Sequence, residues 1–184
     1  MKTELSDGRI NVRRYRAEDI PLLFEAARES VNELHPWLPW CHANYSVEDS
    51  AAFVMGRDAE WDREEHYSFA VFDLATGDFL GGAGLNFVNR AHNFCNLGYW
   101  TRSSRSGRGI ATAAAKLAAR FGLSELKFQR IEILAAVGNV ASQRVAGKTG
   151  ALREGILRKR LLLYNKPHDA IMYSLTAENC SPDI

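Results

Sequence analysis

The chain has 184 residues, of which 46% are hydrophobic and 24% are charged. This composition is typical of a soluble globular protein and excludes a disordered, collagen-like or disulfide-built chain. No apolar run approaches the roughly 20 residues of a membrane span, and the polar residues 1–8 lack the apolar core of a signal peptide. We therefore expect a single domain over residues 1–184, located in the cytoplasm and without a membrane partner.

The cysteines and histidines show no pattern of a metal or disulfide site. Cys41, Cys95 and Cys180 are odd in number, scattered, and form no C-x-x-C pair. The five histidines likewise lack metal-ligand spacing. This usage favours a reducing compartment and predicts no metal.

The formal net charge of +1 conceals an asymmetry along the chain. Residues 1–78 hold 8 basic and 16 acidic side chains, a balance of −8, whereas residues 79–184 hold 15 and 6, a balance of +9. No acidic residue lies between Asp78 and Glu125. The split favours anion binding by the second half and cation binding by the first, although alternating solvated faces would also produce it.

The hydrophobic pattern predicts an order of strands and helices along the chain. Expected strands span 10–15, 67–72, 79–87, 94–101, 130–137, 152–163 and 168–175, and expected helices span 17–33, 46–65, 110–121 and 139–150. Asn139 is expected to cap the last helix and Gly150 to end it, and residues 165–167 are expected to turn between the last two strands. Three consecutive strands in the middle favour a mixed α/β (α+β) fold over a doubly wound one.

A loop rich in Ser, Gly and Arg separates the strand ending at Thr101 from the helix beginning at Ile110. Gly107 and Gly109 allow a tight turn with consecutive N–H groups, and the helix start adds partial positive charge. These features predict a pyrophosphate seat, although a plain strand-to-helix turn would use the same glycines. The loop is no Walker motif, since no G-K-[ST] follows, and no dinucleotide fingerprint, since the third glycine is missing.

Four motifs in register make the pattern specific. They are Gly98-Tyr99-Trp100, Gly107-Arg108-Gly109-Ile110-Ala111-Thr112, Val137-Gly138-Asn139 with Ser142, and Gly150-Ala151 with Glu154-Gly155. Together they resemble the GNAT N-acetyltransferase superfamily, and most of all its RimJ/RimL-like branch of ribosomal-protein N-terminal acetyltransferases. The resemblance covers most of the chain and implies the GNAT fold, a mixed, mostly antiparallel central sheet flanked by helices.

The resemblance also implies a cofactor and residues that bind it. The co-substrate would be acetyl-CoA. Its pyrophosphate would be held by backbone N–H groups of Gly107, Arg108, Gly109, Ile110 and Ala111, and its pantetheine by Tyr99, Trp100, Thr101 and Asn139. Ser142 would stand near the sulfur as the proton donor to the leaving thiolate. Backbone N–H groups around Trp100 would polarise the thioester carbonyl.

The general base is not evident from the sequence. Asn96 stands where many members carry Glu, and Leu161 stands where Rim-type relatives carry an acid. Ala146 replaces the Tyr proton donor of another branch, which favours Ser142. Candidates for a base or a water relay are Glu65, His66, His92, Glu154 and Asp169, of which the last two are also expected to pair with neighbouring basic residues.

The missing carboxylate bears on the choice of acceptor. An α-amine with a pKa near 8 costs about 1.4 kcal/mol to deprotonate at pH 7, whereas a lysine near 10.4 costs about 4.6 kcal/mol. The loss of an evident base therefore favours the N-terminal α-amine of a protein, such as a ribosomal protein. A small-molecule amine (amino acid, polyamine or antibiotic) and a non-catalytic acetyl-CoA-binding module stay open.

Other segments bear on the mechanism and the partners. No Cys with a partnering His lies near the motifs, which favours direct transfer over an acyl-enzyme.

The segment 36–40 is expected either to form a wall of the acceptor pocket through Trp37 and Trp40 or to cap the core. The basic run 158–160 lacks an aromatic platform, so no nucleic-acid partner is expected. A homodimer stays open.

Overall fold

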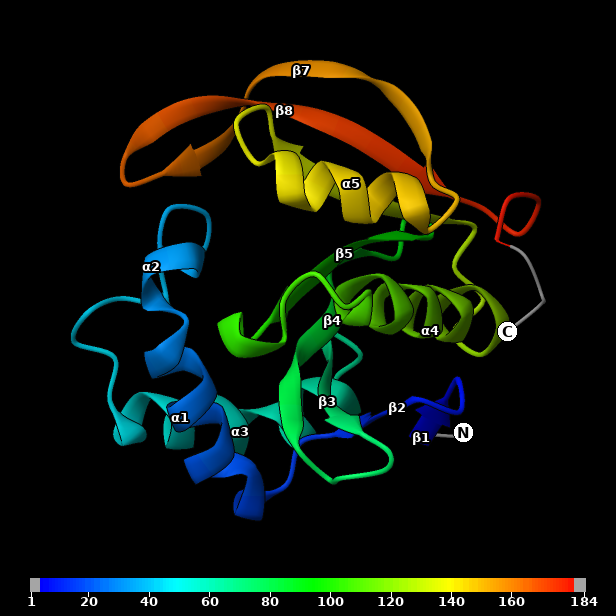
Figure 1. Ribbon diagram of the computed structural model, residues 1–184. Helices are drawn as coiled ribbons and strands as arrows, with labels where there is room; N and C mark the ends of the chain where they lie inside the picture. The colour runs from blue at the N-terminus through cyan, green and yellow to red at the C-terminus, as the bar shows by residue number, and fades with distance from the viewer. Residues whose placement is uncertain (1–3, 181–184) are drawn as a thin grey trace.

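Eight strands form one sheet in the computed structural model, which describes residues 4–180 (Figure 1). The strands are β1 (Glu4–Ser6), β2 (Ile10–Arg14), β3 (Tyr67–Asp73), β4 (Phe79–Asn89), β5 (Phe94–Thr101), β6 (Arg130–Ala136), β7 (Leu152–Leu163) and β8 (Lys166–Leu175). The helices are α1 (Ile20–Glu29), α2 (Val31–Leu34), α3 (Val47–Asp62), α4 (Ile110–Ser124) and α5 (Val140–Lys148). The strand order is β1-β2-β3-β4-β5-β6-β8-β7.

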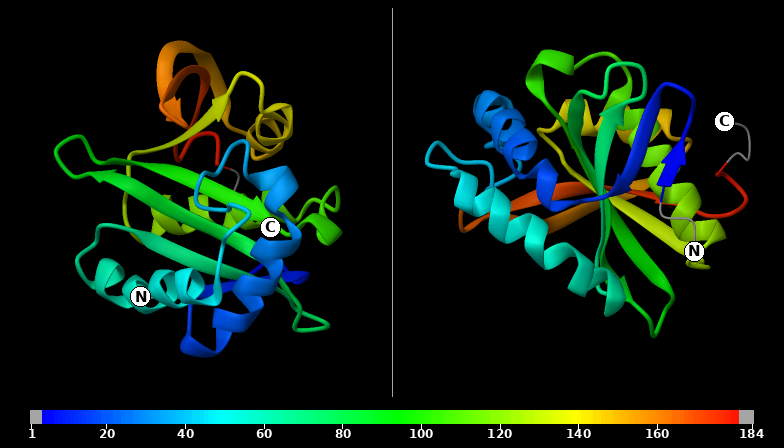
Figure 2. Two further views of the ribbon diagram at one scale, coloured as in Figure 1. Left: turned by 90° about the vertical axis from the view of Figure 1, so that its left-hand side faces the viewer. Right: turned by 90° about the horizontal axis from the view of Figure 1, so that it is seen from below.

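Every strand pair is antiparallel except the central pair, β5 with β6. Helices α1 and α3 lie on one side of the sheet and α4 on the other (Figure 2). This architecture confirms the predicted mixed α/β fold with a mostly antiparallel central sheet. No helix within residues 4–180 is long and apolar enough to cross a membrane.

Three local features differ from the sequence expectations. The three-residue strand β1 was not expected, because so short a segment shows no alternating pattern. The expected helix over 17–33 is broken at Ser30, which leaves helical geometry with φ −106° and ψ 5°. The expected turn at 165–167 is correct only for Asn165: the turn lies at Tyr164 and Asn165, which both have positive φ, and Lys166 and Pro167 belong to β8.

The apolar core has two layers because helices cover both faces of the sheet. Six consecutive residues of β3 are buried, as expected for a strand covered on both faces. Tyr67, Phe69 and Val71 pack in the cluster that includes Leu117 and Phe121 of α4. Ala70 and Phe72 pack in a second cluster with residues of α1 and α3.

The central strands β5 and β6 run together for only a short distance. Phe94, Cys95 and Asn96 pair with residues 130–132 of β6. From Leu97 to Thr101 strand β5 pairs only with β4, while β6 continues along β8. Within the described residues 4–180, the edge of β5 that faces β6 therefore lacks a strand partner from Leu97 to Thr101.

Candidate active site

Glycines remove the side chains from part of the sheet face that α1 and α3 cover. Gly84 of β4 lies opposite Gly98 of β5, and Gly82 lies opposite Trp100. These positions share one face, since successive residues of a strand alternate between faces. They form the floor of a cavity of about 160 Å³, the sheet cleft, whose walls include Leu38, Trp40, Phe53, His66 and Ser68.

A second cavity adjoins the sheet cleft. This aromatic pocket has a volume of about 360 Å³. The two cavities share Tyr15, Trp40, Phe53 and Trp100 in their linings. The aromatic pocket is completed by Leu23, His42, Tyr45 and Asp49.

The two tryptophans of the segment 36–40 occupy different places. Trp40 lines both cavities and makes edge contacts with Tyr45 and Trp100, at centroid distances of 5.6 and 5.5 Å. Trp37 lines neither cavity. It packs instead over Gly138, where an added Cβ would lie 3.1 Å from its ring.

The glycine loop enters α4 through a left-handed turn. Gly107 and Gly109 have φ of +75° and +79°, and a Cβ added at either would meet nothing within 4 Å. These glycines are therefore required because the backbone has positive φ there, and not because a side chain would lack space. Gly109 is the N-cap of α4, so the first N–H groups of this helix have no partner within the helix. Arg9 reaches the loop and donates to the carbonyl of Arg108 at 3.2 Å.

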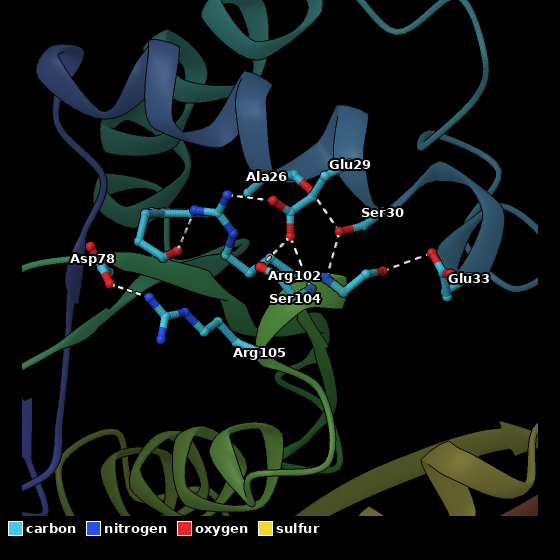
Figure 3. Close-up of polar contacts among 10 residues, drawn as sticks. Ala26, Glu29, Ser30, Glu33, Asp78, Arg102, Ser104 and Arg105 are labelled. Atoms are coloured by element: carbon cyan, nitrogen blue, oxygen red, sulfur yellow. Dashed lines mark hydrogen bonds and ion pairs between the residues drawn. The ribbon is translucent and has the colours of Figure 1, made fainter.

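A polar network fastens the segment before this loop to the end of α1 (Figure 3). Arg102 donates to Glu29 at 2.5 Å, and Ser104 donates to the same carboxylate through its N–H (3.1 Å) and its hydroxyl (2.7 Å). The Ser103 N–H donates to the Ser30 hydroxyl at 2.9 Å. The Arg102 hydrogen bond, assisted by Ser104, lowers the pKa of Glu29 to about 2.

The acid-free stretch of the sequence does not make an acid-free surface. Acids from the first half of the chain neutralise part of its positive charge. The pairs are Arg90 with Glu64, Arg102 with Glu29, and Arg105 with Asp78. Some of the acidic residues of the first half and basic residues of the second half therefore form ion pairs that join the two halves of the chain.

Ser142, expected near the cofactor sulfur, lies beside Asn139 and Tyr99, which were expected to hold the pantetheine. Asn139 accepts a hydrogen bond from the Ser142 N–H at 3.0 Å and so caps α5, as predicted. The Tyr99 hydroxyl donates to the Ser142 carbonyl at 3.0 Å and lies 3.2 Å from the Ser142 hydroxyl. Burial raises the pKa of Tyr99 to about 12, so this hydroxyl keeps its proton at neutral pH.

Of the candidate bases, His66 lines the sheet cleft. Its Nδ1 atom lies 3.4 Å from Arg57 Nη1 and 3.4 Å from Glu60 Oε2. Burial, followed by the positive charge of Arg57, lowers the pKa of His66. The imidazole is therefore neutral at pH 7.

Other acidic candidates are engaged in structural contacts. Glu154 forms a two-pronged pair with Arg130, at 2.7 and 2.5 Å, and its pKa is lowered to about 2, chiefly by this arginine. Asp169 accepts a hydrogen bond from the Lys159 N–H at 2.8 Å. Glu65 pairs with Arg63 at 2.8 Å.

Two polar atoms near the cleft and on β5 lack partners within residues 4–180. Asn96 donates to Asn86 at 2.8 Å, and its own Oδ1 is buried without a hydrogen bond. The hydroxyl oxygen of Thr101 is likewise buried and unpartnered.

The cleft contains residues that the sequence reasoning did not select. Tyr15 and Phe53 line both cavities, and Gly82 and Gly84 form part of the floor. The run Gly81-Gly82-Ala83-Gly84 inside an expected strand was the available signal, because interior glycines of a strand mark a close approach. Tyr15 had no comparable signal.

Comparison with known proteins identifies the family. Residues 9–152 match the model described as the acetyltransferase (GNAT) domain. The chain belongs to this family. Membership confirms the predicted family and the predicted class of enzyme, an N-acetyltransferase.

Relatives and solved structures agree with this assignment. The putative ribosomal N-acetyltransferase YdaF of Bacillus subtilis is 27% identical over 168 residues, which is 90% of each chain. A putative ribosomal-protein-serine acetyltransferase from Vibrio cholerae is 28% identical, with a TM-score of 0.83 over 96% of this chain and 99% of that one. RimJ of Mycobacterium smegmatis, solved with CoA-disulfide, is 26% identical, with a TM-score of 0.84 over 92% and 82%.

The Glu29 contacts predict the effect of removing this carboxylate. Glu29→Ala leaves the Ser104 N–H without its acceptor, so its exchange with solvent should accelerate about tenfold or more. Native-state hydrogen exchange measures this change. The control is Glu25→Ala, one turn earlier on the exposed side of α1, and equal exchange in both variants would contradict the prediction. Because the pKa of Glu29 is depressed, wild-type protection should be complete above pH 4.5 and decline as the pH falls toward 2.

Proposed function

We propose that the chain transfers the acetyl group of acetyl-CoA to the N-terminal α-amine of a protein, such as a ribosomal protein. The observation that carries this proposal is the parting of β5 from β6 beside the glycine loop. YdaF is described as a putative ribosomal N-acetyltransferase and the Vibrio cholerae protein as a putative ribosomal-protein-serine acetyltransferase, and the RimJ structure contains CoA-disulfide.

The chain offers acetyl-CoA two kinds of backbone contact. The free edge of β5 at Tyr99, Trp100 and Thr101 would pair with the amides of pantetheine as an added strand. The N–H groups of the residues from Gly107 to Ala111 would hold the pyrophosphate, favoured by the positive end of α4. Asn139 uses its Oδ1 to cap α5, which leaves its amide nitrogen for a pantetheine carbonyl.

The transfer itself needs few side chains. The amine nitrogen attacks the thioester carbon, the C–N bond forms, the C–S bond breaks, and the amine loses one proton. Backbone N–H groups near Trp100 would stabilise the negative oxygen of the intermediate. The departing thiolate would take a proton from the Ser142 hydroxyl, which lies 3.2 Å from the Tyr99 hydroxyl, and Ser142 would regain this proton from water.

Direct transfer is favoured over an acyl-enzyme. Burial raises the pKa of the Cys41 thiol to about 11. Burial is also the main reason why the pKa of the Cys95 thiol is raised to about 12. Both thiols are therefore protonated and poorly nucleophilic at neutral pH. Neither lines the sheet cleft or the aromatic pocket.

An α-amine fits the cleft better than a lysine does. The cleft holds a neutral imidazole, His66, and no carboxylate among its lining residues. A weak base suffices for an amine with a pKa near 8. We therefore propose that His66 takes the proton from the acceptor amine, directly or through a water molecule.

We also infer that the protein is a single domain and acts in the cytoplasm. One sheet joins β1 to β8, which supports a single domain. The cysteines at 41, 95 and 180 are all free thiols, as in a reducing compartment.

Release of the CoA thiol tests the activity. The panel contains short peptides with a free N-terminus, the same peptides with a blocked N-terminus and an internal lysine, free amino acids, polyamines and an aminoglycoside. We expect release with the free N-termini and a single acetyl group on the α-nitrogen by mass spectrometry. Faster turnover of a small amine would reject the protein acceptor. Binding of acetyl-CoA without release would instead identify a binding module.

A pair of glycine variants tests the pyrophosphate seat. Gly109 and Gly77 both have positive φ and open space around them, so alanine at either should cost about 1–2 kcal/mol of stability. Gly109→Ala should also weaken acetyl-CoA binding about tenfold or more by calorimetry, because it displaces the loop N–H groups. Gly77→Ala should leave the affinity unchanged. Equal affinity in both variants would reject the seat.

Ser142→Ala tests the proton donor. Loss of a positioned acid should lower kcat by about 100-fold while the affinity for acetyl-CoA stays unchanged. The control is Ser124→Ala at the end of α4, whose hydroxyl donates to the Arg120 carbonyl. An unchanged kcat for Ser142→Ala at every pH would exclude this role.

A further inference from the structure

Two hydrogen-bond donors converge above Gly82. A Cβ added at this glycine would lie 2.7 Å from the Tyr15 hydroxyl oxygen and 2.8 Å from Trp100 Nε1. The absence of a side chain at Gly82 is thus what allows both groups to point to one place over β4. Within residues 4–180, neither group has a hydrogen-bond partner.

Both groups can act as donors. The indole N–H of Trp100 can only donate. Tyr15 is 5% exposed, and burial raises the pKa of its hydroxyl far above the usual value, so it keeps its proton. Both residues line the two cavities. Two donors that meet at one point of a cavity wall offer two hydrogen bonds to a ligand oxygen there.

The donor pair occupies the junction of the two cavities. Tyr15 and Trp100 line both the sheet cleft and the aromatic pocket, and Gly82 belongs to the floor of the sheet cleft. An acceptor whose amine lies in the sheet cleft therefore has the donor pair beside its next atoms and the aromatic pocket beyond them.

The aromatic pocket favours an apolar group. Besides His42 and Asp49, its lining consists of aromatic residues and one leucine: Tyr15, Leu23, Trp40, Tyr45, Phe53 and Trp100. Its one carboxylate, Asp49, is exposed and accepts hydrogen bonds from the N–H and hydroxyl of Ser46 in a capping box. A volume of about 360 Å³ accommodates a large amino-acid side chain and is poorly filled by that of Ser or Ala.

Resting on the proposed function, we infer that the preferred acceptor is a peptide with a large apolar first residue. Its side chain occupies the aromatic pocket, and its first carbonyl oxygen accepts hydrogen bonds from Tyr15 and Trp100. Tyr15 is then a substrate-binding residue that fixes the amine relative to the thioester. Gly82 is required because any side chain there would occupy the position of that oxygen.

The first test compares peptides that differ only in their first residue. Peptides beginning with Leu, Met or Phe should have kcat/KM about tenfold or more above those beginning with Ser or Ala, since even one methylene group in an apolar pocket is worth about 10–200-fold. An equal or higher value for Ser, Ala, Lys or Arg would overturn the inference while leaving the acetyltransferase activity established. If no acceptor released thiol, the proposed function would fail. Calorimetric binding of the Leu and Ser peptides would then decide the pocket preference separately.

The second test separates the donor pair from the pocket. Tyr15→Phe should lower kcat/KM about tenfold for the Leu peptide but leave it unchanged for phenethylamine, an amine with an apolar tail and no carbonyl. The matched control is Tyr45→Phe, because this tyrosine lines the same pocket while its hydroxyl accepts a hydrogen bond from Ser50 at 2.9 Å. If Tyr15→Phe lowered kcat/KM equally for the peptide and for phenethylamine, at unchanged thermal stability, the proposed contact with the carbonyl oxygen would be overturned.

Discussion

The parting of β5 from β6 is the constraint on which the rest of the site depends. Parallel strands that stayed paired would satisfy each other's backbone groups and leave no edge for a ligand. Here pairing stops after Asn96, and β6 continues with β8 instead. The strand carrying Tyr99 and Trp100 thus has one edge joined to β4 and one edge open, at the level where α4 begins and α5 is capped.

Electrostatic contacts fasten the segment after β5, which leads to the glycine loop, to the end of α1. The acidic first half of the chain supplies Glu29, which holds Arg102 and Ser104 ahead of the glycine loop. Ser30 adds a second connection, because its hydroxyl donates to Ala26 in α1 and accepts from Ser103. The side of the molecule that carries the aromatic pocket is therefore tied directly to the side that carries the loop. These contacts cancel part of the charge separation in the sequence.

Local patterns in the sequence predicted the elements and the family motifs. Asn139 as a helix cap and the positive φ of Gly107 and Gly109 follow from the chemistry of each residue and its neighbours. The acceptor side was not predictable in the same way. Tyr15, Phe53 and His66 meet in the cleft only because β2, α3 and β3 pack against one another, and no spacing in the chain encodes that meeting. Trp37 and Trp40 show the same limit, since Trp40 lines both cavities and Trp37 lines neither.

The glycine floor also bears on how such an enzyme changes its substrates over time. The shape of a binding surface built from side chains changes when whole side chains are replaced. The shape of this floor would change by one methyl group with each substitution of a glycine by alanine, while the sheet stays fixed. At Gly98 a Cβ would have its nearest contact at 3.6 Å, at Gly84 it would lie 3.2 Å from His66, and at Gly82 it would block two donors. These three glycines, which are neighbours on the sheet, therefore offer three graded steps, from tolerated to exclusive. Relatives with the same fold can thus diverge in acceptor choice without repacking the core.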